Sequence, residues 1–174
     1  HCSIQNVQAM KKAALTLLFG ILVIPFVMAQ KGYDIGDKAM NFKLKNVDGS
    51  YVSLSDYQDE KGVIVVFTCN HCPYAQAWEN RIIRIDKQFD SQGYPVVAIQ
   101  PNDPELSPGD SFENMKERSR KKNYTFPYLL DETQKVYRTY GAKRTPHVFV
   151  LQNQSGDFVV KYIGAVDDNY KNPE

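Results

Sequence analysis

The sequence predicts a single α/β domain with a mixed central sheet and flanking helices, and three observations support this prediction. Continuous runs of β-branched residues, typical of strands buried on both faces, alternate with segments of helical periodicity. The last two strands are joined by a short turn-rich segment, which indicates an antiparallel pair. An apolar content of 43% with 24% charged residues is ordinary for a folded chain and excludes general disorder.

Residues 10–29 have the three parts of a secretory signal peptide. Lys11 and Lys12 form a basic start, residues 13–28 carry no charge, and Val27 and Ala29 stand at the third and first positions before a cleavage site. We therefore expect cleavage after Ala29 and a secreted or periplasmic protein. The alternative is a membrane anchor, but the uncharged stretch is shorter than the ~20 residues that span a bilayer. We expect no stable membrane insertion after cleavage.

Charge and cysteine content narrow the possible functions of the remaining chain. Residues 1–9 precede Met10 and are interpreted as upstream sequence, which leaves residues 30–174 as the domain. The chain has 21 Lys and Arg residues against 20 Asp and Glu, so no basic excess indicates nucleic-acid binding. Three cysteines cannot form a disulfide scaffold. Without Cys2, the domain keeps one pair, Cys69 and Cys72.

The domain begins with a predicted β-hairpin extension. Residues 42–44 and 52–54 alternate between apolar and polar side chains, and Asp48-Gly49 is a hairpin turn signal. Residues 62–68 are a continuous β-branched run, which predicts a strand buried on both faces. A helix is predicted from Pro73 to about Phe89. The apolar residues expected on its buried face are Tyr74, Ala77, Trp78, Ile82, Ile85 and Phe89.

The second half of the domain continues the alternation of strands and helices. Residues 95–99 predict a second buried strand, and the proline-rich residues 101–110 predict a loop. Asp110 and Glu113 are expected to cap a helix that ends near Lys122. The remaining predicted elements are a strand at 128–130, a helix at 134–140 and strands at 147–151 and 158–163.

The segment with the clearest chemistry is a Cys-x-x-Cys motif, Cys69 to Cys72, where a buried strand ends and a helix begins. Two thiols at this spacing can close a small disulfide ring. We expect the first cysteine near the helix N-terminus, where free N–H groups and the helix dipole favour a thiolate. His71, when protonated, would stabilise that thiolate further.

The same two cysteines could instead be inert core residues or ligands of a structural zinc ion. The junction between strand and helix favours a redox motif over inert cysteines. A structural zinc site needs four ligands, and the sequence has no second Cys-x-x-Cys. We therefore expect no metal and no cofactor.

These motifs resemble the thioredoxin-fold superfamily, and more closely the secreted thioredoxin-like redoxins grouped with AhpC/TSA and TlpA-type reductases. The resemblance runs from about Tyr33 to Asn169 and implies a thioredoxin-like sandwich. It is carried by Gly36-Asp37-Lys38-Ala39, Phe42-Lys43-Leu44, Asp48-Gly49, Leu54-Ser55-Asp56, Val65 to Tyr74, Phe126-Pro127-Tyr128 and Arg144-Thr145-Pro146-His147. The superfamily normally closes with a helix after its last hairpin. Residues 167–174 show no such pattern, so we expect that this helix is missing through truncation and leaves an apolar sheet face exposed.

The resemblance also implies roles for individual residues. Cys69 corresponds to an exposed nucleophile and Cys72 to a buried resolving thiol. Pro146 corresponds to a cis-proline that faces the disulfide and leaves the backbone of Thr145 free to pair with a substrate strand. The residues expected to support the pair or tune its pKa are Thr68, His71 and Pro73.

Two further residues lie beside the Thr-Pro element. Arg144 could take the role of a peroxide-orienting arginine. His147 would either lie near the site or simply begin the next strand, and we favour the strand role.

The leading functional hypothesis is thiol–disulfide exchange on protein thiols and disulfides, with a membrane or periplasmic electron donor. Its direction is open, because His71 resembles DsbA-type oxidants whereas the framework resembles TlpA-type reductants. Peroxiredoxin-like peroxide reduction is one alternative, although Thr68 is not three residues before either cysteine. Copper handling through Cys69, Cys72 and His147 is another, although such chaperones usually space their cysteines one residue further apart.

Overall fold

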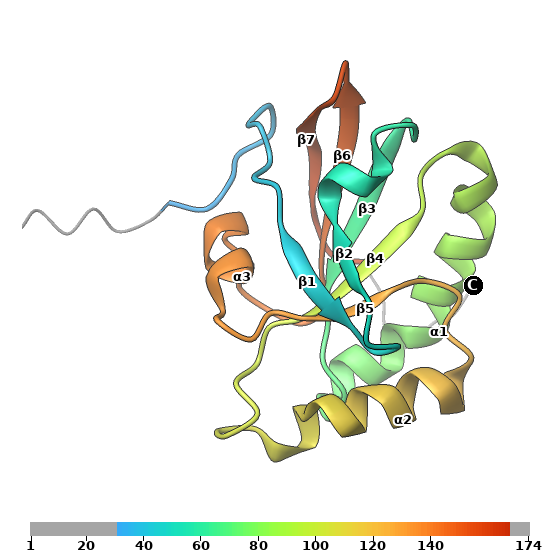
Figure 1. Cartoon of the computed structure of the whole chain (residues 1–174), viewed down its shortest axis with the longest axis vertical. Helices are drawn as coiled ribbons and strands as arrows, with labels where there is room; N and C mark the ends of the chain where they lie inside the picture. The colour runs from blue at the N-terminus through green and yellow to red at the C-terminus, as the bar shows by residue number, and fades with distance from the viewer. Residues whose placement is uncertain (1–30, 168–174) are drawn as a thin grey trace, which may run out of the picture.

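The structure, a computed structural model, describes residues 31–167 (Figure 1). The predicted signal peptide at residues 10–29, the upstream residues 1–9 and the C-terminal end at residues 168–174 lie outside the described residues. A seven-stranded mixed sheet forms the centre, in the order β2-β1-β5-β4-β3-β6-β7. The strands are β1 (Lys43–Asn46), β2 (Tyr51–Ser53), β3 (Gly62–Phe67), β4 (Val96–Gln100), β5 (Tyr128–Leu130), β6 (His147–Gln154) and β7 (Asp157–Gly164).

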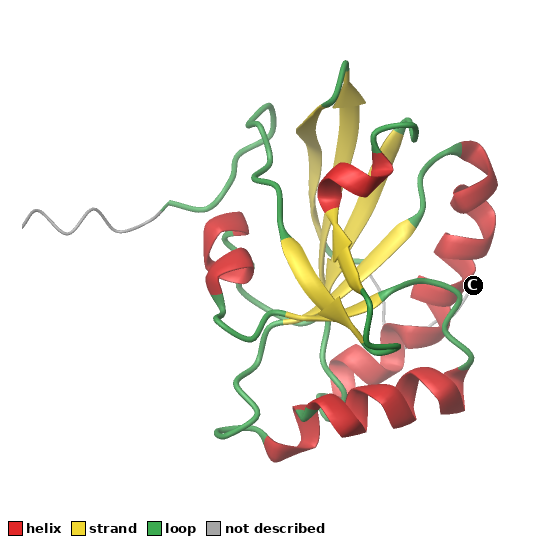
Figure 2. Ribbon diagram, viewed as in Figure 1, coloured by secondary structure: helices red, strands yellow, loops and turns green. Residues whose placement is uncertain are grey.

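Helices cover both faces of this sheet (Figure 2). Helices α1 (Pro73–Phe89) and α2 (Phe112–Lys122) contribute Trp78, Ile82 and Met115 to one core cluster. Helix α3 (Lys135–Tyr140) contributes Val136 and Tyr140 to the cluster on the opposite face. Three short 3-10 helices connect these elements, at Leu54–Tyr57, Asp90–Gln92 and Pro108–Asp110. This arrangement confirms the predicted α/β sandwich with its N-terminal hairpin.

The two central strands are buried along their whole length, as their β-branched composition predicts. β3 pairs in parallel with β4 and antiparallel with β6, so it is an interior strand of the sheet. β6 and β7 extend beyond the predicted residues and meet at a tight turn, where Ser155 has a φ of 57° and Gly156 a φ of 95°. The polar residues Asn153 and Gln154 remain in the strand because they pair with β7.

The buried face of α1 differs from the predicted one. Tyr74 is 59% exposed and Ala77 is also exposed, whereas Ala75 is buried. The buried residues Glu79 and Asp86 continue the face at helical spacing. A pattern built from apolar residues misses them, because each carboxylate is satisfied by hydrogen bonds rather than excluded from the interior.

The cap predicted for α2 is also wrong. Ser111, not Asp110, is the N-cap, and its hydroxyl accepts a hydrogen bond from the amide of Asn114. Asp110 is completely buried and points away from the helix, toward the Cys-x-x-Cys loop. The predicted C-terminal end of α3 is confirmed, since Gly141 terminates the helix with a φ of 75°.

An apolar hollow of about 720 Å³ lies against the sheet on the side of α1. Ile85 and Phe89 of α1, Ile64 of β3 and Val148 and Val150 of β6 are among its lining residues.

A buried ionic cluster joins α1 to α2 through Glu79. Its carboxylate accepts hydrogen bonds from Arg118 at 2.7 and 3.0 Å and from the hydroxyl of Tyr124, and it forms an ion pair with Lys122 at 2.9 Å. The basic end of α2 is therefore engaged with a buried partner rather than wholly solvated. Burial opposes ionisation of Glu79, but the hydrogen bonds from Arg118, Tyr124 and Lys122 outweigh it and lower its pKa below the ordinary 4.5.

We predict that Glu79→Gln lowers the free energy of unfolding by about 2 kcal/mol at pH 7, because it leaves the two cations without their buried counter-charge. A carboxylate whose pKa is lower in the folded than in the unfolded protein contributes its full stabilisation at pH values above the unfolded-state pKa. The difference between wild type and variant should therefore shrink as the pH falls below 4.5. Urea unfolding at several pH values measures both effects.

Glu113→Gln is the matched control, because Glu113 is an exposed acid of α2 that pairs with Lys116, three residues further along that helix. It should change stability by less than about 0.5 kcal/mol. Equal destabilisation by the two variants would contradict the assigned role of Glu79.

Candidate active site

The Cys-x-x-Cys motif occupies the connection between the central strand and the first helix. Thr68 follows β3 and is buried, and its amide donates to the carbonyl of Ile99 at 2.9 Å, which extends the pairing with β4 by one residue. Cys72 is the N-cap of α1 and Pro73 is its first residue. The helix therefore starts directly after the second cysteine, at the predicted residue.

The Thr145-Pro146 loop lies directly against both sulfur atoms. The peptide bond before Pro146 is cis, as the resemblance implies. The hydroxyl of Thr145 lies 3.1 Å from Sγ of Cys69, and the thiol of Cys72 donates to the Thr145 carbonyl at 3.9 Å. Loops that are far apart in sequence thus form one site around the two thiols.

The exposure of the two cysteines is the reverse of the expected order. Cys69 is only 6% exposed, whereas Cys72 is half-buried, and both are free thiols. Burial raises the pKa of Cys69 to about 11, and the negative charge of Asp110 adds to this effect, although Thr145 and the amide of Cys72 oppose it. Cys69 is therefore poorly suited to form a thiolate unaided.

Cys72 has the electrostatic environment that was expected for the first cysteine. Partial burial disfavours its thiolate, but hydrogen bonds from the amides of Ala75 and Tyr74 outweigh burial and lower the pKa of Cys72. The physical reason is the start of α1 at Pro73, which directs the free N–H groups of the first turn toward the N-cap residue. The acidic and more accessible thiol is therefore the second one.

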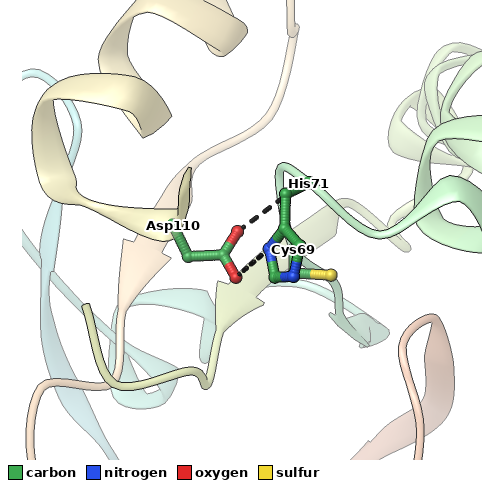
Figure 3. Close-up of side chains that lie close together, drawn as sticks. All are labelled: Cys69, His71 and Asp110. Carbon is green, nitrogen blue, oxygen red and sulfur yellow. Dashed lines mark hydrogen bonds and ion pairs between the residues drawn. The ribbon is translucent and has the colours of Figure 1, made fainter. Parts of the chain in front are cut away.

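Asp110 is a site residue that sequence reasoning did not identify. One carboxylate oxygen accepts hydrogen bonds from the amides of Asn70, at 2.7 Å, and His71, at 3.4 Å. The other lies 2.6 Å from Nδ1 of His71 and accepts from the side chain of Asn102 at 2.7 Å. In Figure 3 the imidazole ring lies between this carboxylate and the sulfur of Cys69.

Asn70, the other residue between the cysteines, is held by a buried polar network. Its side chain donates to the carbonyl of Gly109 at 3.2 Å and accepts from the hydroxyl of Tyr128 at 2.9 Å. Its carbonyl accepts from the side chain of Gln76 at 2.7 Å. With the Asp110 carboxylate, these three partners fix the conformation of the loop between the thiols.

Arg144 and His147, the two further residues considered for the site, differ from each other in burial. Arg144 is exposed and lines a hollow of about 480 Å³ with Lys143 and Gln134. His147 is buried as the first residue of β6, its Nδ1 accepts from the amide of Lys143 at 3.3 Å, and its ring packs edge-on against Phe149. Burial, with the nearby charges of Arg144 and Lys143, lowers the pKa of His147. The favoured strand role of His147 is confirmed.

Within residues 31–167, one group of side chains has donor atoms close enough to share a metal ion. It consists of Cys69, His71 and Asp110, whose sulfur, nitrogen and oxygen atoms lie within 4.8 Å of one another. In this group the carboxylate of Asp110 already accepts hydrogen bonds from Asn70, His71 and Asn102.

Similarity to known proteins agrees with this geometry. The family model described as AhpC/TSA family matches residues 35–166. A curated relative, the thiol-disulfide oxidoreductase ResA of Halalkalibacterium halodurans, is 25% identical over 133 residues, which cover 76% of this chain and 70% of that protein.

Two solved structures show the same architecture. The crystal structure of an uncharacterized conserved protein from Geobacillus kaustophilus is 37% identical, with a TM-score of 0.74, and the match covers 79% of this chain and 71% of that one. An exposed lipoprotein thioredoxin of Streptococcus pneumoniae has a TM-score of 0.60 at 24% identity, covering 76% of this chain and 93% of that one, which shows the fold alone. With its family match spanning the whole described sheet and both cysteines, the chain belongs to the AhpC/TSA family.

Proposed function

We propose that this protein is a thiol–disulfide oxidoreductase in which Cys69 and Cys72 alternate between a dithiol and a disulfide. The observation that carries the proposal is the placement of two free thiols at a helix N-terminus against the Thr145-Pro146 loop. The similarity to a curated thiol-disulfide oxidoreductase supports the same reaction class.

We assign the order of attack from the exposure of the two thiols and from the position of Cys72 at the N-cap of α1. Cys72, accessible and with a lowered pKa, attacks one sulfur of a partner disulfide. The partner's S–S bond breaks, its leaving sulfur departs as a thiolate that takes up a proton, and a mixed disulfide with Cys72 remains. Cys69 then loses its proton and attacks Sγ of Cys72, which releases the second partner thiolate. Two electrons pass to the partner, and the reverse sequence oxidises a partner dithiol.

Thr145 and Pro146 border both sulfur atoms and are the proposed substrate-facing residues. A partner segment that lies along this loop would bring its disulfide to the accessible thiol of Cys72. Pro73 fixes the helix start that places Cys72 at the N-cap. Thr68 contributes through its backbone, as the last residue paired with β4.

The proposed setting is outside the cytoplasm, where protein disulfides persist. This part of the proposal depends on residues 10–29 acting as an export signal and on residues 30–174 forming the mature domain. Within the part of the chain that the structure describes, no helix has the length and apolar character needed to cross a bilayer. A protein thiol pair at the membrane or in the periplasm would return the disulfide to the dithiol.

Trapping with single cysteine variants tests the reaction and the order of attack together. In the full chain carrying Cys2→Ser, we expect Cys69→Ser to form a stable mixed disulfide with oxidised insulin through Cys72. Cys72→Ser should form at least about tenfold less, because its remaining thiol is buried and has a high pKa. Non-reducing gels and mass spectrometry measure the adducts.

The opposite pattern, with capture by Cys72→Ser alone, would restore the order implied by the family resemblance. Capture by neither variant, combined with rapid consumption of hydrogen peroxide by the unmutated pair, would replace exchange by peroxide reduction.

The pH dependence of alkylation gives a second prediction. With Cys69→Ser, iodoacetamide should react with Cys72 along a curve whose midpoint lies below the ordinary thiol value of 9.0. With Cys72→Ser, the midpoint for Cys69 should lie near 11. Both measurements use the Cys2→Ser background, and mass spectrometry counts the labelled thiols. Coincident midpoints would contradict the assigned difference between the two cysteines.

A further inference from the structure

Two exposed cations, Lys143 and Arg144, stand directly before the loop that borders both sulfur atoms. The next residue, Thr145, places its hydroxyl 3.1 Å from Sγ of Cys69, and its carbonyl lies 3.9 Å from Sγ of Cys72. A partner segment that extends along this loop would advance about 3.3 Å per residue. The residues next to its disulfide would therefore pass close to the two cations.

The same two cations line a hollow of about 480 Å³. The other lining residues come from the loop after β4, from the start of α3 and from the segment that follows α3, and they are Pro101, Asn102, Gln134, Tyr137 and Ala142. None of these lining residues is acidic. The hollow therefore presents positive charge together with amide groups, which is a lining complementary to a carboxylate.

The positive charge of this hollow is not neutralised by the protein itself. Among residues 31–167, the ion pairs formed by lysine and arginine include neither Lys143 nor Arg144. Burial lowers the pKa of His147 at the start of β6, and the charges of Arg144 and Lys143 lower it further. The whole chain is nearly neutral, with 21 basic and 20 acidic residues, so this uncompensated pair is a local feature.

Hydrogen bonds hold the walls of the hollow in place. The side chain of Gln134 donates to the carbonyl of Pro101 at 3.0 Å, which joins the start of α3 to the loop after β4. The side chain of Asn102 donates to the carboxylate of Asp110 at 2.7 Å. The same carboxylate accepts from the amide of Asn70, between the two cysteines. The hollow is therefore formed before a partner binds, and its position relative to the thiols is fixed.

We propose that this hollow is a recognition site for the carboxylate of a glutamate or aspartate that lies close in sequence to the exchanged disulfide of the partner protein. This inference rests on the exchange function proposed above, and it specifies the chemistry of the partner. The planar guanidinium of Arg144 can bind both oxygens of a carboxylate, and Lys143 adds a second positive charge. An acidic residue about two or three positions from the partner cysteine would reach the hollow while that cysteine faces the thiol pair.

Disulfide-linked peptides that differ in one residue test this site. The substrate is a dimer of a short peptide with a single cysteine, labelled with a dye that is quenched in the dimer. The second residue after the cysteine is Glu, Gln or Lys. The reduced full chain, carrying Cys2→Ser, is in excess, so that its two thiols become a disulfide. Two electrons and two protons pass to the peptide dimer, which becomes two thiols. Stopped-flow fluorescence measures the rate constant for each peptide.

We expect the parent chain to reduce the Glu peptide at least about fivefold faster than the Lys peptide in about 0.1 M salt, with the Gln peptide between them. In about 1 M salt the ratio should fall below about twofold, because salt screens exposed charges. Lys143→Gln combined with Arg144→Gln should bring the ratio below about twofold already at the lower salt concentration, mainly because the Glu peptide reacts more slowly.

Arg120→Gln combined with Lys135→Gln is the matched control. It removes the same net charge from exposed residues of α2 and α3 that do not line the hollow. This control should retain at least about half of the parent ratio. An equal loss in the control would show that only net charge matters. A ratio retained without Lys143 and Arg144 would place the recognition elsewhere on the protein, and either result overturns the proposal.

The peptide series on the parent chain needs no substitution near the hollow, so it decides the question even if a variant fails to fold. Equal rates for the three peptides would overturn the acidic recognition site while leaving exchange intact. If none of the peptides is reduced, the proposed exchange reaction itself is contradicted.

Discussion

The carboxylate of Asp110 is the constraint on which the geometry of the cysteine loop depends. The loop leaves a buried strand and enters a helix, so the amides of Asn70 and His71 belong to neither element's hydrogen-bond ladder. An unpaired buried amide costs about 1–3 kcal/mol. Asp110 satisfies both amides from a loop forty residues away and is itself held by Asn102. The two thiols are thus positioned by a partner that neither β3 nor α1 supplies.

The helices that carry this site are joined a second time, farther along their length. α1 places Cys72 at its N-cap, and α2 begins directly after the loop that carries Asp110. Glu79, on α1, binds Arg118 and Lys122 on α2. The contact of Asp110 with the cysteine loop and the ion pairs of Glu79 lie at different positions along the two helices. Together they oppose rotation of one helix against the other. The ionic cluster therefore supports the geometry around Asp110 as well as the stability of the fold.

Local sequence patterns predicted the strands and the start of α1. The cis bond before Pro146 was predicted from the family resemblance. They did not predict the role of Asp110, because its partners lie far away in sequence and its place before a helix is typical of a cap. Ser111 is the N-cap of α2, which leaves Asp110 free for another role. The buried face of α1 was misjudged for a related reason: Glu79 and Asp86 are buried only because α2 and the segments around Val96 and Thr125 provide their partners.

The reversed exposure of the cysteines follows from the point at which α1 begins. With Pro73 as the first residue of α1, the free amides of its first turn reach Cys72, while Cys69 remains beneath the loops. A thiol with a pKa near 11 is almost entirely protonated at pH 7. In the proposed cycle this difference orders the reaction: the acidic thiol meets the partner first, and the buried thiol reacts only after the mixed disulfide has brought a target to it.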